Sequence, residues 1–382
     1  MRKIKIIRAV TASQSIGFFE PMVKDLQERG YEIVSVSSPG ESLIRLREKG
    51  VKVIEVPIER RISMFRDLKS LMRMISVFRK EKPFMVHSMT PKAGMLCMLA
   101  AWITRVPRRV HTFTGLVWPT SIGLKRRILM ATDWLTCACA THIIPEGKGV
   151  MNDLQNHITK KPMKVLGYGN VRGVDMEKFS RRTEVEDMAK GIKTEGIFTF
   201  IFVGRIVGDK GINELVSAFA ELHKKYEKTR LLLIGNFEQQ LDPLQAETLN
   251  VIDKHTSIES LGPKYGDELL AYYAASDCFV FPSYREGFPN TVMEAGAMGL
   301  PSIVTDINGS REIIIDGKNG VIIPSKDVEA LYHAMEEMIT NTDKTKEYAA
   351  NAREMIASRF ERSFVCKCLY DFYEEICGIN HT

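Results

Sequence analysis

Apolar runs of strand length alternate with longer amphipathic segments along almost the whole chain. Short apolar runs bounded by Gly, Pro or Asn are typical of buried strands, whereas apolar residues three or four apart are typical of helices that cover a sheet. Their alternation predicts parallel sheets with helices on both faces. We therefore expect an α/β fold with two Rossmann-like, doubly wound domains.

The alternation occurs in two series. Strands of the first series are expected over residues 3–10, 31–38, 51–58, 83–89 and 108–114. Strands of the second series are expected over residues 197–206, 229–237, 257–262, 278–283, 301–306 and 320–324. Helices are expected in the intervals, notably over residues 20–29, from about residue 64, over 92–103, from residue 210, after Pro289 and from residue 327.

The polar, weakly periodic segment 172–196 separates the two series and is expected to be a linker. At 382 residues the chain is also longer than a single core usually supports. We expect an N-terminal domain over 1–175, a C-terminal domain over 190–358, and an amphipathic helix over 360–382 that returns to the first domain. Ligands of such folds bind at the carboxyl ends of the strands, so we expect the site between the two halves.

Charge is divided unequally between the halves. Residues 1–180 contain 31 Lys and Arg against 15 Asp and Glu, a net charge of +16, and the remainder contains 22 against 32, a net charge of −10, which together give the +6 of the whole chain. The basic half suggests an anionic surface or ligand, and the acidic half argues against general nucleic-acid binding.

The seven cysteines lack the C-x2-C spacing of zinc or redox sites, so we expect reduced, buried thiols and no metal site. Charges interrupt the apolar residues of the first ten positions, which is unlike a signal peptide. The longest nearly apolar run, residues 93–104, is about half of the ~20 residues that a membrane span needs. These features predict a cytoplasmic protein.

Two cations follow the first strand of the second series. Gly204 and Arg205 lie where that strand ends, and Lys210 lies where the next helix is expected to begin. Unpaired N–H groups and the positive end of the helix dipole favour an anion there, whereas a lysine in a first turn is otherwise disfavoured. This pattern predicts a phosphate site. Neither this segment nor "GYGNVRG" at 167–173 fits the G-x-G-x-x-G fingerprint of dinucleotide binding.

Two acids surround a loop that follows another apolar strand. In "SYREGFPNTVMEAGAMG", Glu286 lies in the loop and Glu294 lies about one turn inside the helix after Pro289. Carboxylates bind vicinal hydroxyls, and free amides at a helix start bind phosphate or sugar oxygens. A ligand that carries both a polyol and phosphates fits this set.

The segment from Gly204 to Pro324 resembles the nucleotide-sugar half of retaining glycosyltransferases of family 4, which have the GT-B fold and a Glu-x7-Glu motif. The segments "ERGYEI", "VHSMTPKAG" and "RRVHTFTGL" make the first half similar to members that build bacterial surface polysaccharides on lipid carriers. The resemblance covers nearly the whole chain. It implies a first domain that binds the acceptor and a second that binds the nucleotide sugar, expected to be a UDP-sugar.

The resemblance assigns roles where residues match. Arg205 and Lys210 would hold the donor diphosphate, and Glu286 would contact the donor sugar; these three residues would be catalytic. Glu294 would contact the ribose. The full set of implied donor-binding residues is Gly17, Gly204, Arg205, Lys210, Gly287, Phe288, Pro289, Asn290, Thr291 and Glu294. No cofactor or metal is expected, because the cations themselves would stabilise the departing phosphate.

The acceptor side is less defined by motifs. Many relatives have histidines where this chain has Met89 and Thr114, which leaves His87, His111 and Thr114 as acceptor-side candidates. A lone histidine in an apolar strand is also typical of a core residue. The segment from residue 64 carries an apolar stripe among cations, and residues 123–135 add a basic cluster; either a membrane-lying helix or a helix packed on a sheet fits.

The resemblance implies a hexosyltransferase acting on a glycan or lipid-linked acceptor, and the basic first half leads us to expect peripheral contact to an anionic membrane. Two alternatives remain open from the sequence. A sugar-nucleotide epimerase of the same fold would use the same diphosphate site without an acceptor. A non-catalytic subunit would bind the sugar nucleotide without turnover.

Overall fold

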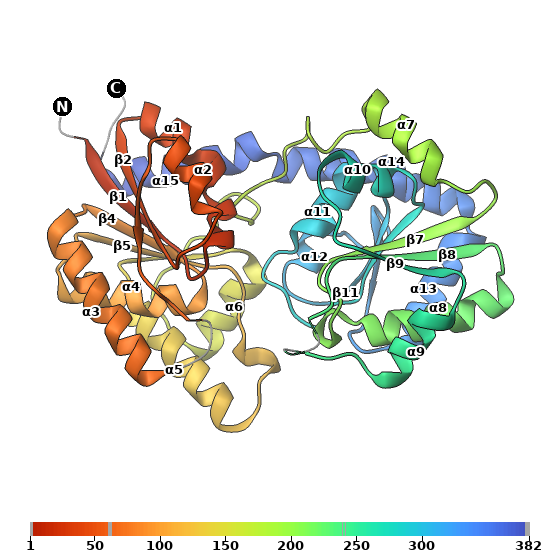
Figure 1. Ribbon diagram of the computed structural model, residues 1–382, viewed down its shortest axis with the longest axis horizontal. Coiled ribbons are helices and arrows are strands. Elements are labelled where there is room, and N and C mark those ends of the chain that lie inside the picture. Colours follow the sequence, from red (N-terminus) through yellow and green to blue (C-terminus); the bar gives the residue numbers. More distant parts are fainter. Residues whose placement is uncertain (1–2, 60–62, 239, 241, 379–382) are drawn as a thin grey trace. The chain divides into compact units, whose positions relative to one another are not determined.

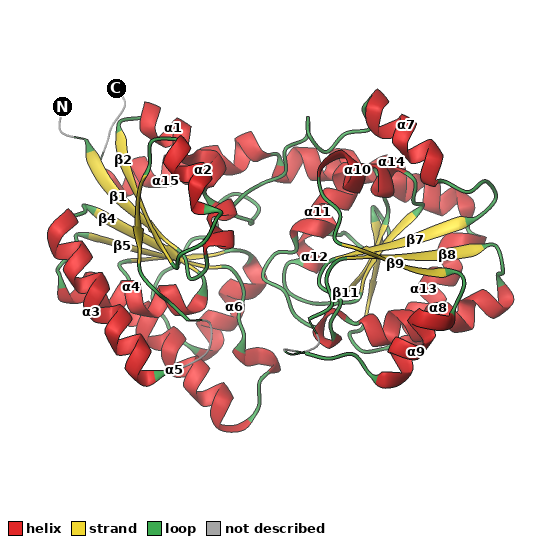
Figure 2. Ribbon diagram, in the orientation of Figure 1, coloured by secondary structure: helices red, strands yellow, loops and turns green. Residues whose placement is uncertain are grey.

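The computed structural model describes residues 3–59, 63–238, 240 and 242–378, and it divides into two compact units. The first unit comprises residues up to 173 together with the C-terminal residues from 363, and the second comprises residues 174–362. Each unit contains one sheet covered by helices on both faces (Figures 1 and 2). This is the α/β architecture that the alternation predicts, with two sheets as expected.

The six strands of the first sheet pair in the order β3-β2-β1-β4-β5-β6, all parallel. Their bounds are β1 Ile4–Ala9, β2 Tyr31–Ser37, β3 Lys52–Glu55, β4 Met85–Met89, β5 Arg108–Phe113 and β6 His142–Pro145. Helices of this unit are α1 Val23–Glu28, α2 Leu43–Glu48, α3 Met64–Glu81, α4 Pro91–Ile103, α5 Gly123–Cys139, α6 Lys148–His157 and α15 Arg362–Cys377. The last helix, α15, packs its buried residues on the first sheet, as the amphipathic pattern of 360–382 predicts.

The second sheet repeats the topology of the first. Its order is β12-β11-β10-β7-β8-β9, so β7 occupies the position that β1 occupies in the first sheet. The strands are β7 Phe198–Val203, β8 Thr229–Ile234, β9 Ile258–Gly262, β10 Cys278–Phe281, β11 Ser302–Thr305 and β12 Gly320–Ile323. The helices are α7 Thr183–Ile192, α8 Ile212–Lys225, α9 Ala246–Lys254, α10 Gly266–Ala274, α11 Asn290–Ala297, α12 Ser310–Ile313, α13 Val328–Thr340 and α14 Thr342–Phe360.

The polar segment 172–196 is not a plain linker. It contains α7, which buries Val185 and Ala189 and packs against α10 in the second unit. Two well-spaced apolar positions in a ten-residue helix are enough to dock it, because neighbouring helices supply the rest of the core. The boundary between the two units, after Gly173, does fall in this segment, but the linker interpretation was wrong for the part that forms α7.

Candidate functional site

The two predicted cations lie at the carboxyl end of β7. Arg205 follows the strand by two residues, and Lys210 ends a short 3-10 turn over Gly208–Lys210 that leads into α8. Gly211 has a φ of +72°, and a Cβ there would lie 2.1 Å from the carbonyl oxygen of Pro282. Only glycine permits this approach, which brings the lysine beside the loop that follows β10.

Lys210 and Glu286 form an ion pair in this space, and their side chains are 13% and 15% exposed. Ser283 Oγ donates a second hydrogen bond to Glu286 Oε1 over 2.7 Å. The Lys210 Nζ also lies 5.3 Å from the ring centroid of Phe281. The structure thus brings together a cation and an acid that are 76 positions apart in the sequence.

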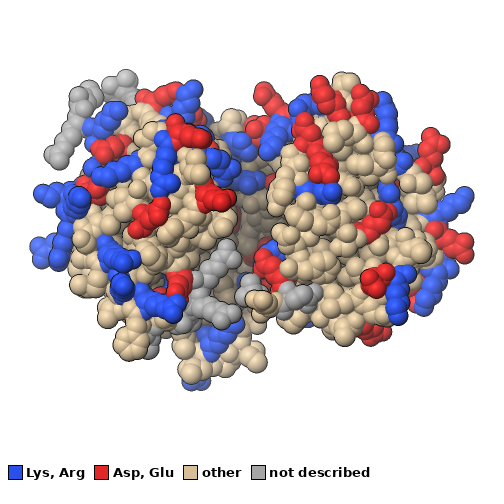
Figure 3. Space-filling view, viewed as in Figure 1, with Lys and Arg blue, Asp and Glu red and all other residues tan. Residues whose placement is uncertain are grey.

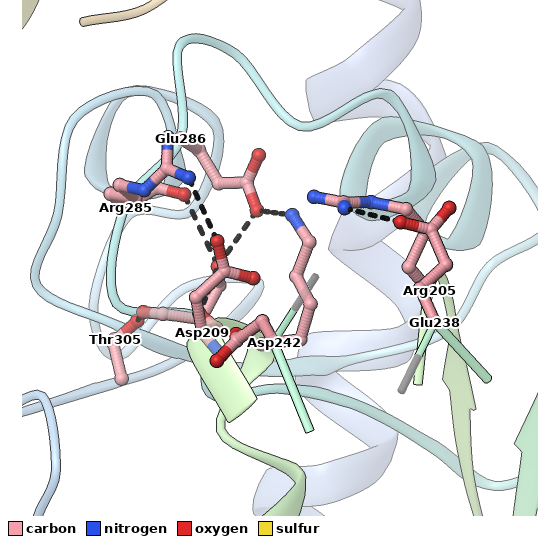
Figure 4. A network of polar contacts seen from close by, with 9 residues as sticks. Arg205, Asp209, Glu238, Asp242, Arg285, Glu286 and Thr305 are labelled. Atoms are coloured by element: carbon pink, nitrogen blue, oxygen red, sulfur yellow. Dashed lines mark hydrogen bonds and ion pairs between the residues drawn. The ribbon is translucent and has the colours of Figure 1, made fainter. Parts of the chain in front are cut away.

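Arg205 completes the cluster. Its Nη1 donates to Glu238 Oε2 over 3.0 Å, and its side chain remains 46% exposed. Burial lowers the pKa of Arg205, but its hydrogen bond to Glu238 and the charges of Asp209, Glu238 and Glu286 together raise it. Figure 4 shows the side chains of Arg205 and Glu286 pointing toward each other. The guanidinium stays charged, and its exposed part can receive an anion.

Four contacts fix the loop that carries Glu286. Arg285 pairs with Asp209 over 2.9 Å, and the Tyr284 amide donates to the Asp209 carbonyl over 2.8 Å (Figure 4). The Tyr284 hydroxyl donates to Glu214 over 2.6 Å, and the Asp209 amide donates to Asp242 over 2.5 Å. Sequence reasoning did not identify these partners. Asp209 was within reach, since it directly precedes Lys210 in "GDKG".

Helix α11 starts at Asn290, with Pro289 as its N-cap. Its first amides have no partner within the helix, which is the arrangement expected for an oxygen-binding site. Asn290 and Thr291 are half-buried, whereas Gly287 and Pro289 are buried. The ring centroid of Phe288 lies 5.3 Å from that of Phe360 in the core, so the side chain of Phe288 is a packing group.

Glu294 lies on the inward side of α11 and is 9% exposed. Burial raises the pKa of the Tyr273 phenol and the negative charge of Glu294 raises it further, which places that carboxylate near α10. Gly204 ends β7 beside Arg205, and a Cβ on Gly204 would lie 3.0 Å from the Phe202 ring. The donor-side residues of the second unit therefore gather around the ends of β7 and β10 and the start of α11.

The first-unit candidates lie in different surroundings. Gly17 is in a 3-10 turn over Ser13–Phe18, and a Cβ there would meet nothing within 4 Å. Thr114 is half-buried directly after β5. His87 and His111 are each 1% exposed. His87 is hydrogen-bonded to Tyr373 and Thr112, and His111 is hydrogen-bonded to Ser88. Both histidines are core residues, so their side chains are not on a binding surface.

Burial lowers the pKa of His111 to about 3 and that of His87 well below its usual value, so both rings are neutral at pH 7. All seven cysteines are free thiols; five of them are buried, as expected, whereas Cys368 and Cys377 are half-buried. Among the residues that the structure describes, no three His, Cys, Asp or Glu side chains form a metal-binding group. No helix within those described ranges combines the length and apolarity that crossing a bilayer requires.

Residues 184–355 match the family described as glycosyl transferases group 1, and residues 18–169 match the glycosyl transferase 4-like domain. The chain is 31% identical over 376 residues to the capsular polysaccharide biosynthesis glycosyltransferase CapM of Staphylococcus aureus, covering 98% of this chain and 97% of the relative.

It is also 27% identical over 348 residues to an Escherichia coli enzyme named UDP-Gal:alpha-D-GlcNAc-diphosphoundecaprenol alpha-1,3-galactosyltransferase, covering 88% of this chain and 87% of that enzyme. Among solved structures, the Anabaena protein HepE in complex with UDP-glucose aligns with a TM-score of 0.79 at 17% identity, covering 97% of this chain and all of HepE. At that identity the likeness establishes the shared GT-B fold alone.

Proposed function

The chain belongs to the group 1 glycosyl transferases, and from that premise we propose that it transfers a hexose from a UDP-sugar to a saccharide or lipid-diphosphate-linked acceptor in surface polysaccharide synthesis. The names of the Staphylococcus and Escherichia relatives support the pathway class, and the second also supports the donor nucleotide and the lipid carrier. Retention of the anomeric configuration is proposed on the family resemblance.

One observation carries the donor assignment. Arg205 and Lys210 lie at the carboxyl end of the same strand. Glu286 forms an ion pair with Lys210, and its negative charge also acts on Arg205. Cleavage of a sugar-diphosphate bond leaves negative charge on the departing phosphate. Fixed cations stabilise that charge more in the transition state than in the ground state, and this difference accelerates the reaction. Glu286 is placed to exchange its lysine partner for a hydroxyl of the donor sugar.

A donor screen tests this proposal. Thermal shift with UDP-, GDP- and other activated sugars is expected to identify UDP-sugars as stabilising ligands, and the active donor should then label membrane lipid extracts. Free epimer released without acceptor would identify an epimerase instead. Donor binding with no product on any acceptor would identify a binding subunit. Proton NMR of the anomeric position in the product tests retention.

We further propose that divalent metal is dispensable, because Arg205 and Lys210 supply the positive charge that a metal would otherwise provide. The expected outcome is an unchanged rate of transfer after EDTA treatment and buffer exchange. A loss of activity that Mg²⁺ or Mn²⁺ restores would contradict this part of the proposal.

The acceptor side of the proposal rests on an exposed face of the first unit. On α3, Phe65 is 89% exposed, and Leu68 and Met72 continue the same stripe at helical spacing. At the start of α5, Ile122 and Leu124 are 86% and 73% exposed. Large apolar side chains are rarely displayed together on a soluble surface without a partner. Helices α3 and α5 both pack on α4, so these residues share one side of the unit.

Basic residues accompany the exposed apolar ones. Arg66, Lys69 and Arg73 lie on α3, and Lys125 and Arg127 lie on α5, all of them exposed. Figure 3 shows Lys and Arg side chains over the part of the first unit where Figure 1 draws α3. Cations beside exposed apolar groups favour an anionic lipid surface, where a lipid-diphosphate acceptor would lie. We propose peripheral attachment at the inner face of the plasma membrane through this side.

Sedimentation with vesicles containing phosphatidylglycerol at low salt tests the attachment. The wild-type chain should pellet, and Phe65→Ser combined with Leu124→Ser should weaken binding on the order of tenfold or more, because each side chain would lose apolar burial in the bilayer. Ile44→Ser on α2, where the isoleucine is 52% exposed, is a matched control that should bind normally. If the wild-type chain stays in the supernatant, the attachment proposal is wrong, while the donor assignment is unaffected.

A further inference from the structure

Arg8, in β1, is 1% exposed and lies inside the core of the first unit. Its Nη1 donates to the Tyr373 hydroxyl over 2.5 Å, its Nη2 lies 3.2 Å from Met89 Sδ, and its guanidinium lies 4.9 Å from the ring centroid of Phe19. Its Nε has no hydrogen-bond partner. Among the residues that the structure describes, none forms an ion pair with Arg8.

This arrangement is costly for a group that cannot lose its charge. The guanidinium remains protonated in proteins, and an isolated buried charge carries a large desolvation penalty. A phenol, a thioether and an aromatic ring offset part of that penalty, but none of them is negative. The observation therefore points to a missing anion.

The hydrogen bonds around Arg8 run in one direction. Because arginine only donates, the Tyr373 hydroxyl must accept from it and give its own hydrogen to His87 Nδ1, 2.6 Å away. Burial and the charge of Arg8 lower the pKa of His87, which is therefore neutral with its proton on Nε2. The Nε2–H group donates a hydrogen bond to Thr112 Oγ1 over 2.7 Å. The threonine hydroxyl is therefore left to donate its own hydrogen at the end of the series.

Both ends of this series line one small cavity. Arg8, His87, Met89 and Thr112 contribute from the strands, Leu369 closes it from α15, and Asn170 closes it from the loop before the second unit. The cavity is small, with a volume of about 10 Å³ available to the centre of a water molecule. That is about the room that one water molecule requires, so the cavity can hold at most a single small ligand.

We propose that this cavity binds one small inorganic anion of the size of chloride, held by the Arg8 guanidinium and the Thr112 hydroxyl. The anion neutralises the buried charge of Arg8 and accepts hydrogen bonds from the guanidinium, whose Nε otherwise has no acceptor, and from the Thr112 hydroxyl. Since Tyr373 and Leu369 belong to α15, the bound anion also stabilises the docking of the C-terminal helix on the first sheet. The inference is independent of the transfer reaction and of the donor site.

Calorimetric unfolding of the full chain tests the site, with sodium chloride compared with sodium gluconate at constant ionic strength. Gluconate is too large for the cavity. The Tm should rise with the logarithm of the chloride concentration above the Kd, by about 3 °C or more once chloride exceeds its Kd tenfold. Crystals grown in bromide should show an anomalous peak beside the Arg8 guanidinium.

Arg8→Met should abolish the difference between chloride and gluconate, and Arg79→Met, which removes an exposed arginine of α3, should keep it. Should Arg8→Met fail to fold, Thr112→Val removes the second donor and should weaken the chloride dependence. Equal Tm values in both salts, with no bromide peak, would mean that the cavity holds a water molecule and would overturn the proposal. A chloride dependence that persists in Arg8→Met would overturn it as well.

Discussion

The two sheets have the same strand order, and in each an arginine lies at the carboxyl end of the first strand. Arg8 is still inside β1, one residue before its end, and Arg205 lies two residues beyond β7. Arg8 is 1% exposed and has no acidic partner in the described chain, whereas the Arg205 side chain is 46% exposed and pairs with Glu238.

Position relative to the strand end accounts for the difference. A residue inside a parallel strand must point to one face of the sheet, and helices cover both faces. Arg8 therefore enters the core beneath α15. Past the strand end the backbone no longer pairs on both sides, so the Arg205 side chain can face solvent and a ligand. The same residue type is thus a buried internal charge in the first unit and, in the second, a partly exposed side chain for which we propose the donor diphosphate as ligand.

The largest expected effect comes from removing the exposed cations. Arg205→Ala or Lys210→Ala should lower kcat/KM on the order of 10²-fold or more, as electrostatic groups at a developing charge typically contribute that much. Both variants should keep the wild-type Tm within a few degrees, because neither side chain is part of the core. Steady-state transfer assays check this. Lys225→Ala, which removes an exposed lysine of α8 paired with Glu336, is the matched control; near-normal turnover without Arg205 or Lys210 would refute their role.

A pH dependence of stability should come from the first unit. The pKa of His111 is about 3 and that of His87 is also lowered, both because of burial, against about 6.5 in the unfolded chain. Below pH 6.5 the unfolded chain takes up protons that these folded side chains do not, so the free energy of unfolding falls as the pH falls. Two such groups should remove about 2–3 kcal/mol between pH 7.5 and 5.5.

Urea unfolding at the two pH values measures this loss. His111→Asn should remove about half of it, because one of the two groups no longer titrates. A loss of the same size in the variant and the wild-type chain would show that other groups cause the pH dependence.

Tyr373→Phe should disturb the hydrogen bonds of Arg8 without affecting Arg205. The variant leaves Arg8 Nη1 and His87 Nδ1 without their shared partner, which should cost about 1–3 kcal/mol of stability. UDP affinity should stay at the wild-type value, because Arg205 is in the other unit. Denaturant unfolding and calorimetric titration give the two readouts. Tyr265→Phe, at a tyrosine that is 73% exposed, should change neither; an unchanged stability of Tyr373→Phe would contradict the importance of the network.

The smallest expected effect concerns the partner of Arg205. Exposed ion pairs contribute about 0–1 kcal/mol, so a phosphate can displace Glu238 at low cost. Glu238→Gln removes the competing charge and should tighten UDP binding about two- to fivefold. Glu268→Gln breaks a comparable exposed pair with Lys264 and should leave UDP affinity unchanged. If Glu238→Gln binds UDP more weakly, the carboxylate helps to hold the ligand rather than competing with it.

The sequence predicted the fold class and the order of most elements because β-branched and aromatic runs mark buried strands independently of their partners. The proximity of Arg205, Lys210 and Glu286 was also predictable, because all three follow the carboxyl ends of strands. Arg205 and Lys210 follow β7, and Glu286 follows β10, which is its neighbour in the sheet. The strand β6 was not identified, because its sequence, His-Ile-Ile-Pro, offers only two β-branched residues before a proline.

Contacts between distant positions could not be read from local patterns. The partner of Arg8 is 365 positions away and that of His87 is 286 positions away, so neither suggested a shared network. The Asp209–Arg285 pair that fixes the Glu286 loop was also missed, although these residues directly precede Lys210 and Glu286. Phe288 was assigned to the donor site through its backbone amide, and the sequence did not show that its ring packs against Phe360 of α14 in the core.

The most direct test of the central claim is a comparison of UDP with uridine by calorimetric titration, because the two ligands differ only in the diphosphate. The wild-type chain should bind UDP on the order of 100-fold more tightly than uridine, since charge-assisted contacts to the diphosphate supply the difference. In the double variant Arg205→Ala and Lys210→Ala this ratio should fall below about tenfold. A ratio that stays at the wild-type value in the double variant would place the diphosphate elsewhere and contradict the account.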